Sequence, residues 1–202
     1  WIRTKYPDLP IVRYGHSMGA FVVLNLTHNN APAGTILTGL KFDRKFNLLL
    51  LRAFLYFCCK VLGEQRRATF AHKITFAPLN RSISKKASSF DWVSRNTKLL
   101  TKYLRDPFCG NIVSWGYFYT LTTLLLNMHE AHRYKSVTHS LIITGENDPL
   151  SKGGSKLTKL TTKLNQGKGV NHTIIPEAFH KVEHDPNEHV VLDHIKEYLA
   201  KI

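Results

Sequence analysis

One serine of this chain stands where its hydroxyl could act as a nucleophile. Residues 15–19 read Gly-His-Ser-Met-Gly, with Ser17 at the centre. A short apolar run, Ile11–Tyr14, precedes this pattern and a helical spacing of apolar residues follows it, so Ser17 is predicted to lie on a sharp turn between a strand and a helix. On such a turn the backbone is strained, the side chain points outward, and an amide at the helix start can stabilise an oxyanion. We expect Ser17 to be the nucleophile and the Met18 N–H to be an oxyanion donor.

The glycines of this pattern, Gly15 and Gly19, have an expected steric role. The turn is so tight that a side chain at either position is predicted to collide with the neighbouring strand or helix. His16 lies between Gly15 and the serine and belongs to the same predicted nucleophile elbow.

A serine hydroxyl is a weak nucleophile near neutral pH, so it needs a base to take its proton and an acid to orient that base. Where the serine sits on such an elbow, an acid and then a histidine follow it along the chain. Asp148 follows the apolar run Leu141–Thr144, and His180 follows the run Thr173–Ile175. Because the carboxyl ends of parallel strands share one edge of a sheet, we predict that Ser17, Asp148 and His180 act together.

These assignments have alternatives among neighbouring residues. Asp148 could merely cap the turn before Pro149, in which case Glu146 would be the acid. The chain has eleven histidines, and most are expected to be surface or packing residues. Three of them lie near His180 in the sequence but fit a loop base less well: His172 within a strand, His184 before the terminal helix and His189 on that helix.

Strands and helices alternate at both ends of the chain. The expected strands are Ile11–Tyr14, Gly34–Gly39, His139–Gly145 and Asn171–Pro176. The expected helices are a helix end at Trp1–Tyr6, Ala20–Thr27 (ended by His28-Asn29-Asn30), Ser155–Leu164 and a terminal helix with Asp185 as N-cap and Pro186 as its first residue. This alternation predicts an α/β fold with a parallel sheet and helices on both faces.

Residues 41–138 interrupt this alternation. We expect them to form an inserted helical cap, while residues 1–40 and 139–202 form the core. The predicted cap helices are Phe46–Leu62, Asn96–Leu104 and Tyr117–His129. The first is strongly apolar but slightly short for a membrane span. We favour packing of this helix over a pocket, and the alternative is contact with a lipid surface.

The charge balance is strongly basic, with 28 lysine and arginine residues against 14 acidic ones and a formal net charge of +14. A basic surface could attract nucleic acid or an anionic membrane. The basic residues are scattered and no nucleic-acid-binding motif accompanies them, which argues against nucleic acid. Peripheral contact with an anionic membrane stays open beside the simpler interpretation of a solvated basic surface.

The three cysteines, Cys58, Cys59 and Cys109, have no metal-ligand spacing and cannot all pair. We interpret them as reduced thiols in a cytoplasmic protein. The chemistry predicted for the serine needs neither a metal nor an organic cofactor.

The motifs resemble those of α/β-hydrolases of the lysophospholipase and monoacylglycerol lipase type, the serine aminopeptidase-like group. The elbow follows Pro7-Asp8-Leu9-Pro10, residues 145–149 (Gly-Glu-Asn-Asp-Pro) resemble the acid loop, and residues 179–183 (Phe-His-Lys-Val-Glu) resemble the histidine loop. The stretch from Phe90–Asn96 through Tyr103–Gly110 is similar to the cap of bacterial members. This resemblance spans essentially the whole chain and implies a partial α/β-hydrolase fold. It also implies a serine hydrolase that cleaves carboxylic esters, with a small ester or a lipid of one acyl chain, a lysophospholipid or monoacylglycerol, as substrate.

The sequence departs from that family ahead of the elbow. The family places several strands there, and one of their loops, often beginning His-Gly, supplies a second oxyanion donor. None of this precedes Trp1. We therefore expect either that the natural protein is longer, or that this chain is a weakly active or inactive fragment that serves as an interaction module. In that case the strand Ile11–Tyr14 would be an exposed apolar edge that could pair with another chain.

Overall fold

The computed structural model describes residues 1–26, 32–81, 83, 87–130, 139–165 and 169–202. In chain order its elements are α1 (Ile2–Lys5), β1 (Val12–His16), α2 (Met18–Asn25), β2 (Gly34–Thr38), α3 (Lys45–Leu62), α4 (Thr69–Phe76), η1 (Ala77–Asn80), α5 (Thr97–Arg105), α6 (Trp115–Asn127), β3 (Ser140–Gly145), η3 (Ser155–Leu157), α7 (Thr158–Asn165), β4 (Val170–Ile175), η4 (Val182–His184) and α8 (Glu188–Leu199).

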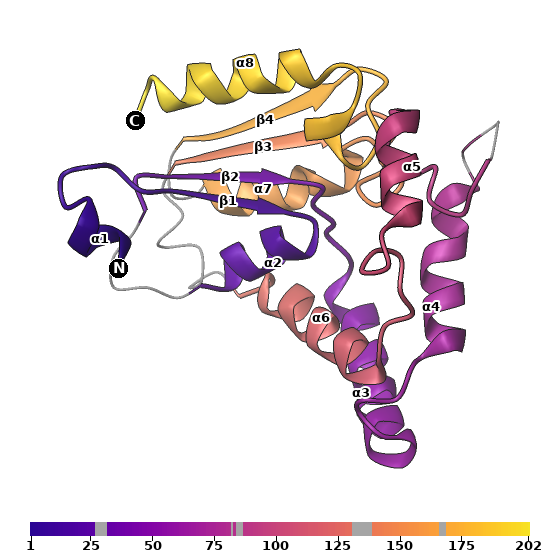
Figure 1. The fold of residues 1–202 in the computed structure, drawn as a ribbon. Helices are drawn as coiled ribbons and strands as arrows, with labels where there is room; N and C mark the ends of the chain where they lie inside the picture. Colours follow the sequence, from indigo (N-terminus) through magenta and orange to yellow (C-terminus); the bar gives the residue numbers. More distant parts are fainter. Residues whose placement is uncertain (27–31, 82, 84–86, 131–138, 166–168) are drawn as a thin grey trace.

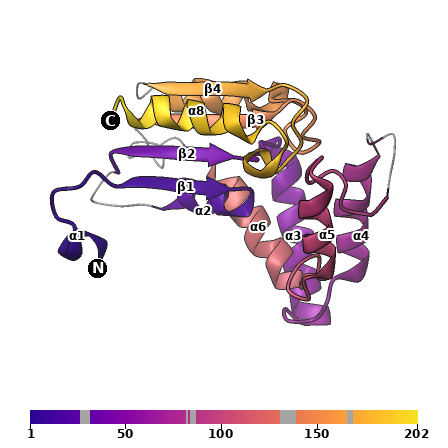
Figure 2. The same ribbon diagram turned by 45° about the horizontal axis from the view of Figure 1, so that its top comes forward.

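The strands form one four-stranded sheet in the order β1-β2-β3-β4, and every neighbouring pair is parallel. Register is continuous across the sheet, so that Tyr14 pairs with Ile36 and Ile36 with Leu141. Because all four strands run the same way, their carboxyl ends meet at one edge (Figures 1 and 2). The predicted parallel sheet is confirmed, and β1 is an edge strand within the described residues.

Helices cover both faces of the sheet, as predicted. In Figure 1, α8 lies over one face, and α2 and α7 lie against the other. The side chains of the central strands alternate accordingly, since successive residues of a strand point to opposite faces. Leu37 and Ile142 join a core with α2 and α7. Ile36 and Ile143 join a second core with Val191 of α8.

The long connection between β2 and β3 carries α3, α4, α5 and α6, which lie beyond the carboxyl edge of the sheet and extend away from it (Figure 2). Helix α3 packs along α6, and Leu55 and Cys58 of α3 join a core with Trp115 and Phe118 of α6. The predicted helix at residues 46–62 is therefore confirmed. Most of its apolar side chains are exposed, however, in place of the packing over a pocket that we favoured.

None of the helices in the described part of the chain combines the length and apolar character that a membrane crossing would require. The three cysteines, Cys58, Cys59 and Cys109, are free thiols.

The start of the terminal helix was predicted wrongly. Helix α8 begins at Glu188 after Asn187, and the preceding residues 182–184 form the short helix η4. Asp185 does not cap α8 with its side chain. Its carboxylate instead accepts hydrogen bonds from Arg95 and from the Phe179 amide. An aspartate before a proline fits an N-cap, but a cation from a distant segment engages this one.

The other helices agree with the sequence to within a few residues. Helix α2 begins two residues before the predicted Ala20, and the expected stop at residues 27–30 lies outside the described part of the chain. The predicted helix at 155–164 divides into η3 and α7. Helices α5 and α6 lie where residues 96–104 and 117–129 predicted them.

Candidate active site

Ser17 lies on a strained turn between β1 and α2. Its φ angle is +52°, in the left-handed region that residues with a side chain seldom adopt. The Ser17 amide donates a hydrogen bond to the Thr38 carbonyl at the end of β2 (2.9 Å), and the Ser17 carbonyl accepts one from the Ala20 amide (3.0 Å). These two hydrogen bonds tie Ser17 to the neighbouring strand on one side and to its own helix on the other.

The two glycines of the elbow differ in their surroundings. A Cβ on Gly15 would lie 2.7 Å from the Ala20 Cα and 2.7 Å from the Gly19 carbonyl oxygen, and a clash with backbone atoms cannot be relieved by a rotamer change. A Cβ on Gly19 would meet nothing within 4 Å. The steric prediction therefore holds for Gly15 and is wrong for Gly19, because Gly19 already belongs to α2 and its free side faces open space.

The side chains of Ser17, His180 and Asp148 form one continuous chain of contacts at hydrogen-bond distance. His180 Nε2 is 3.0 Å from Ser17 Oγ, and His180 Nδ1 is 3.2 Å from Asp148 Oδ2. The Asp148 side chain is fully buried and that of His180 is 4% exposed. A neutral ring with its proton on Nδ1 suits both contacts, because Nδ1–H then donates to the carboxylate and Nε2 accepts from the serine hydroxyl.

The acid loop after β3 presents Asp148 to His180 and turns Glu146 elsewhere. The other Asp148 oxygen, Oδ1, accepts a hydrogen bond from the Leu150 amide (2.9 Å), which orients the carboxylate. Glu146 is exposed and accepts from the Glu177 amide (2.8 Å). Of the two carboxylates considered from the sequence, Asp148 is therefore the one in contact with the histidine.

Each loop that contributes to this chain of contacts holds one strained residue. In the described part of the structure, the residues other than glycine with positive φ are Ser17, Lys152 and Glu177. They lie on the elbow, on the loop after β3 and on the loop after β4. Such strain costs free energy and tends to occur at functional sites, so its distribution marks this edge of the sheet.

Glu183 and His16 form a second polar cluster beside His180. The hydroxyls of Tyr14 and Thr38 both donate to Glu183 Oε1, and His16 Nδ1 lies 2.8 Å from Thr38 Oγ1 and 3.3 Å from Glu183 Oε1. The ring of His16 is 4.9 Å from that of His180. The motif placed His16 here, whereas nothing in the sequence indicated the roles of Glu183 and Thr38.

Burial controls the protonation of this cluster. It raises the pKa of Glu183 from 4.5 to about 7. Burial, followed by the nearby His180 and Lys181, lowers the pKa of His16 from 6.5 to about 3. Both shifts favour the neutral form, so near neutral pH His16 carries no charge and Glu183 is close to its midpoint.

A hollow of about 360 Å³ lies beside the elbow. Met18, the first residue of α2, borders it, and a helix leaves its first amides without intrahelical partners. The Met18 N–H is one of these first amides and directly follows Ser17 in the chain. The rest of the lining comes from the turn after α3 and from α6, and includes Tyr117, Leu121 and Leu124.

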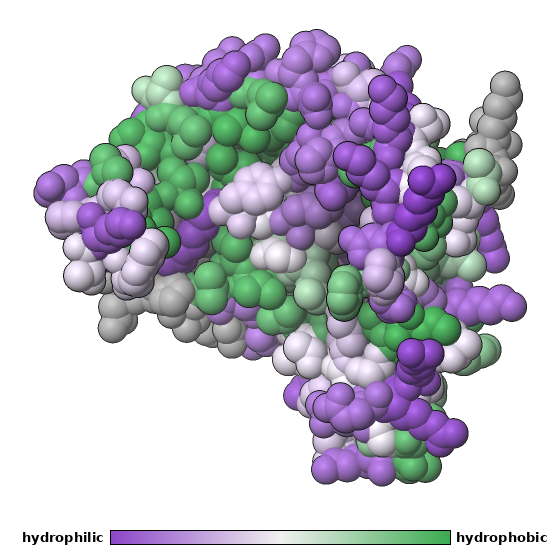
Figure 3. Space-filling model, viewed as in Figure 1, coloured by the Kyte–Doolittle hydropathy of each residue, from purple (hydrophilic) through white to green (hydrophobic). Residues whose placement is uncertain are grey.

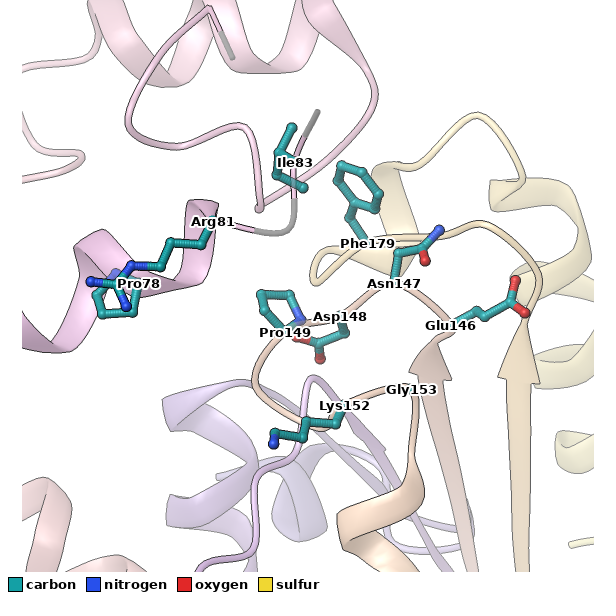
Figure 4. A pocket seen from close by; sticks show the side chains of 10 residues that line it. All are labelled: Pro78, Arg81, Ile83, Glu146, Asn147, Asp148, Pro149, Lys152, Gly153 and Phe179. Carbon is teal, nitrogen blue, oxygen red and sulfur yellow. The ribbon is translucent and has the colours of Figure 1, made fainter. Parts of the chain in front are cut away.

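A second hollow, of about 590 Å³, lies behind the acid loop. Figure 4 shows its two sides: the acid loop with Asp148, Pro149 and Lys152, and the segment after α4 with Pro78, Arg81 and Ile83. Ser17 and Met18 do not line it. This second hollow therefore borders Asp148, whereas the hollow lined by Met18 borders the residue that follows Ser17.

The other histidines considered from the sequence lie apart from this chain of contacts. His172 of β4 bonds the Thr144 hydroxyl through Nε2 (3.0 Å), and burial lowers its pKa. His184 ends η4 and His189 lies on α8. Across the residues that the structure describes, no cluster of three or more histidine, cysteine or acidic side chains is arranged to hold a metal ion.

Comparison with known proteins gives one family match and several structural matches. The family model described as "Serine aminopeptidase, S33" matches residues 1–187. No curated protein sequence matches significantly.

Among solved structures, a highly thermostable carboxyl esterase from Bacillus coagulans, in complex with glycerol, superposes with a TM-score of 0.87 at 21% identity, over 100% of this chain and 67% of that one. A soluble variant of monoglyceride lipase from Saccharomyces cerevisiae gives 0.70 at 14% identity, over 98% and 64%. A monoacylglycerol lipase from Paleococcus ferrophilus gives 0.65 at 15%, over 98% and 71%. At these identities the likeness shows the fold alone, and the chain spans about two thirds of each relative's length.

Proposed function

The chain belongs to the serine aminopeptidase S33 family of α/β-hydrolases, and from this premise we propose that it is a serine hydrolase that cleaves carboxylic esters. Ser17 is the nucleophile, His180 the general base and Asp148 the acid that orients the imidazole. The observation that carries the proposal is the chain of contacts from Ser17 Oγ through His180 to Asp148, at 3.0 and 3.2 Å. A glycine-rich turn without a catalytic role would not require a buried imidazole beside its serine hydroxyl and a buried carboxylate beside that imidazole.

In the first half of the reaction, Ser17 Oγ attacks the ester carbonyl while His180 Nε2 takes the hydroxyl proton. The imidazolium that forms is stabilised by Asp148, whose carboxylate accepts from Nδ1. The carbonyl oxygen becomes an oxyanion, to which the Met18 N–H can donate. When the tetrahedral intermediate collapses, the alcohol leaves with the proton from His180, and an acyl group stays on Ser17.

In the second half, water replaces the alcohol. His180 takes a proton from the water as its oxygen attacks the acyl-serine carbonyl. Collapse of the second intermediate releases the carboxylic acid and returns the proton to Ser17 Oγ. All proton transfers use the one ring, so the orientation of His180 limits both halves.

The hollow beside Met18 supports a substrate with one acyl chain, such as a monoacylglycerol or a lysophospholipid. Leu121 and Leu124 contribute apolar surface to it, and its volume of about 360 Å³ lies at the small end of ligand pockets. The monoglyceride lipase and the monoacylglycerol lipase of similar fold support the same class. We further propose that residues 41–138, which include α6 on the wall of this hollow, act as a cap over the site.

Turnover of nitrophenyl esters of increasing chain length tests this function, together with release of fatty acid from a monoacylglycerol and from a lysophospholipid. We expect hydrolysis that Ser17→Ala abolishes, and preference for lipids with one acyl chain over those with two. Activity that persists in Ser17→Ala would overturn the assignment of the nucleophile. Equal rates on diacyl lipids would overturn the substrate class.

We also propose that helix α3 contacts an anionic membrane surface while the site takes its lipid. One side of α3 packs on α6 through Leu55 and Cys58. Residues three and four apart share a helix face, and the opposite side of α3 carries an apolar stripe whose members are each more than half exposed: Phe46, Leu50, Phe54, Phe57 and Val61. Such an exposed apolar stripe supports a role as an interaction surface.

The charges of α3 support an anionic partner for this stripe. Within α3 the charged residues are Lys45, Arg52 and Lys60, and the helix contains no acidic residue. Apolar side chains flanked by cations suit a surface of anionic lipid. Figure 3 shows hydrophobic and hydrophilic residues side by side on the extension that contains α3.

Sedimentation with lipid vesicles tests this surface. We expect binding to phosphatidylglycerol vesicles that weakens with salt, little binding to phosphatidylcholine, and loss of binding when Leu50 and Phe57 are both changed to serine. Leu192→Ser, at an exposed leucine of α8, is the matched control and should bind like the wild type. Equal binding by both variants would refute the assignment of α3.

A second candidate function is that of a binding module without turnover. It is favoured by one observation: β1 is an edge strand that pairs with β2 alone among the described strands, and a strand from another chain can add to such an edge. Figure 3 shows apolar surface along the sheet between α1 and α8. Folded wild-type protein that hydrolyses none of the esters above would favour this candidate.

A further inference from the structure

The segment from Trp92 to Arg95 lies between α4 and α5, far in sequence from the strands, yet it is firmly anchored. Its backbone is held by Asn80, whose Oδ1 accepts from the Trp92 amide (2.9 Å). Asp91 accepts from the Ser88 hydroxyl and from two amides, at 2.6–3.0 Å. Trp92, Val93 and Ser94 are all buried. A segment tied in this way can act as a fixed support for whatever rests on it.

The loop that carries His180 rests on this support. The His180 amide donates to the Trp92 carbonyl (3.4 Å), and the Lys181 amide donates to the Val93 carbonyl (2.7 Å). The indole of Trp92 lies 5.0 Å from the His180 ring, centroid to centroid. The backbone and the ring of the proposed base are thus both in contact with the segment.

Arg95 connects the support to both sides of His180. Its Nη2 and Nε donate to Asp185 Oδ1 at 2.6 and 3.2 Å, and its Nη1 donates to Glu177 Oε2 at 2.7 Å. The Asp185 side chain is fully buried, and its Oδ2 also accepts from the Phe179 amide (3.4 Å). These bonds, with that to Asp185 foremost, raise the pKa of Arg95 above its ordinary value.

We propose that Arg95 is a positioning residue, which holds the His180 loop through Asp185 and Glu177 so that His180 Nε2 stays within reach of Ser17. This proposal rests on the proposed function. Glu177 precedes His180 and Asp185 follows it, so one guanidinium fixes both ends of the short stretch that carries the base. A planar fork of donors suits this task, because it can bind two carboxylates at once in a set geometry.

The alternative is that Arg95 stabilises the fold and has no effect on the imidazole. The structure argues against it through the Phe179 amide, which is bonded to the same carboxylate as Arg95 and directly precedes His180. Loss of the arginine leaves the buried Asp185 carboxylate without its cation, and this carboxylate must then move toward water or take up a proton. Either response changes the hydrogen bond between Asp185 and the Phe179 amide, and Phe179 directly precedes His180.

Ester hydrolysis by Arg95→Gln, beside Lys98→Gln as a matched control, tests the proposal. Lys98 is exposed in the first turn of α5, and Lys98→Gln should keep the wild-type kcat. For Arg95→Gln we expect kcat to fall about tenfold to a hundredfold with little change in KM, because misplacement of a catalytic group by about 1 Å costs up to about a hundredfold. Arg95→Lys should recover part of the loss, since it keeps the charge but not the fork.

Glu177→Gln extends the test to the more exposed arm of the contact. The Glu177 side chain is 72% exposed, so its loss should lower kcat by no more than about threefold. This variant also serves if Arg95→Gln does not fold. A loss of kcat in Glu177→Gln larger than in Arg95→Lys would contradict the leading part given to Asp185.

Proton NMR of the His180 Cε1–H resonance, identified by its absence in His180→Asn, separates this proposal from the proposed function. We expect the resonance to shift and broaden in Arg95→Gln, while that of His189 on α8 stays unchanged. A wild-type protein that hydrolyses no ester, together with a resonance that still shifts in Arg95→Gln, would overturn the function and support the positioning role. An unchanged resonance, or an unchanged kcat with a lower melting temperature, would show that Arg95 is structural only.

Discussion

The two sides of the candidate site are built from contacts of very different range. The elbow is mostly local: the close approach of Gly15 to Ala20 and the bond from the Ala20 amide to Ser17 lie within six residues of chain, and the Ser17 amide reaches only to Thr38 on the next strand. The histidine side depends on remote contacts, since Arg95 and Asp185 are 90 residues apart and Ser17 and His180 are 163 apart. A short motif can therefore encode the turn that carries Ser17, whereas the position of His180 depends on how the long connection between β2 and β3 packs.

On the histidine side, the largest effect is expected from the loss of Asp148, the proposed acid. Asp148→Asn keeps the shape of the side chain but favours the wrong tautomer of His180, and such a change lowers kcat by about 10⁴-fold in a comparable triad. Steady-state ester hydrolysis measures it. Glu146→Gln is the matched control, because its carboxylate contacts the Glu177 amide and not the ring. A greater loss in Glu146→Gln would reverse the assignment of the acid.

The elbow side can be tested with its two glycines, which the motif treats as equal. Gly15→Ala places a Cβ against backbone atoms at 2.7 Å and should cost about 1–3 kcal/mol of stability or more, as overpacking does. Gly19→Ala enters open space within α2 and should stabilise by about 0.5–1 kcal/mol, since alanine favours the helix. Urea midpoints of the two variants measure the difference. Equal loss in both would mean that the elbow is tight on its helix side as well.

The smallest effect is expected where the two sides meet, at Glu183. Native Glu183 keeps its proton up to pH about 7, whereas the unfolded chain loses it near 4.5, so its contribution to stability falls as pH rises through this window. His16 opposes this trend: it stays neutral down to pH about 3 while the unfolded chain takes up a proton below 6.5, so its contribution falls as pH decreases.

Urea unfolding of Glu183→Gln between pH 4.5 and 7 isolates the glutamate. We expect the variant to gain stability relative to the wild type as pH rises, because only the wild type loses the glutamate's contribution. Glu188→Gln, the same substitution at an exposed residue of α8, is the control. Its stability should change with pH as that of the wild type does. A constant difference between Glu183→Gln and the wild type would show that Glu183 titrates normally in the folded protein.

Much of the fold could be predicted from the sequence because its signals are local. The apolar runs placed all four strands to within two residues, and helical spacing placed α3, α5 and α6. The proximity of Ser17, Asp148 and His180 follows from strand ends that share an edge, although the catalytic roles of these residues stay predictions. A spacing rule describes only how a residue relates to its near neighbours in the sequence.

The errors and omissions concern partners that lie far away in the sequence. Asp185 before Pro186 fits an N-cap, and only packing reveals that Arg95 binds it. In the sequence Glu183 is only a charged residue near His180. The folded structure shows that the hydroxyls of Tyr14 and Thr38 donate hydrogen bonds to it. Gly19 was expected to be crowded because the motif says so, yet crowding depends on what surrounds α2. No local pattern carries this information.

Reaction with a fluorophosphonate probe, followed by peptide mass spectrometry, tests the central claim most directly. The account predicts one adduct, on Ser17, at a rate that falls sharply in His180→Asn, because the hydroxyl reacts only when an imidazole takes its proton. A folded wild-type protein that carries no adduct, or carries it on another residue, would contradict the account.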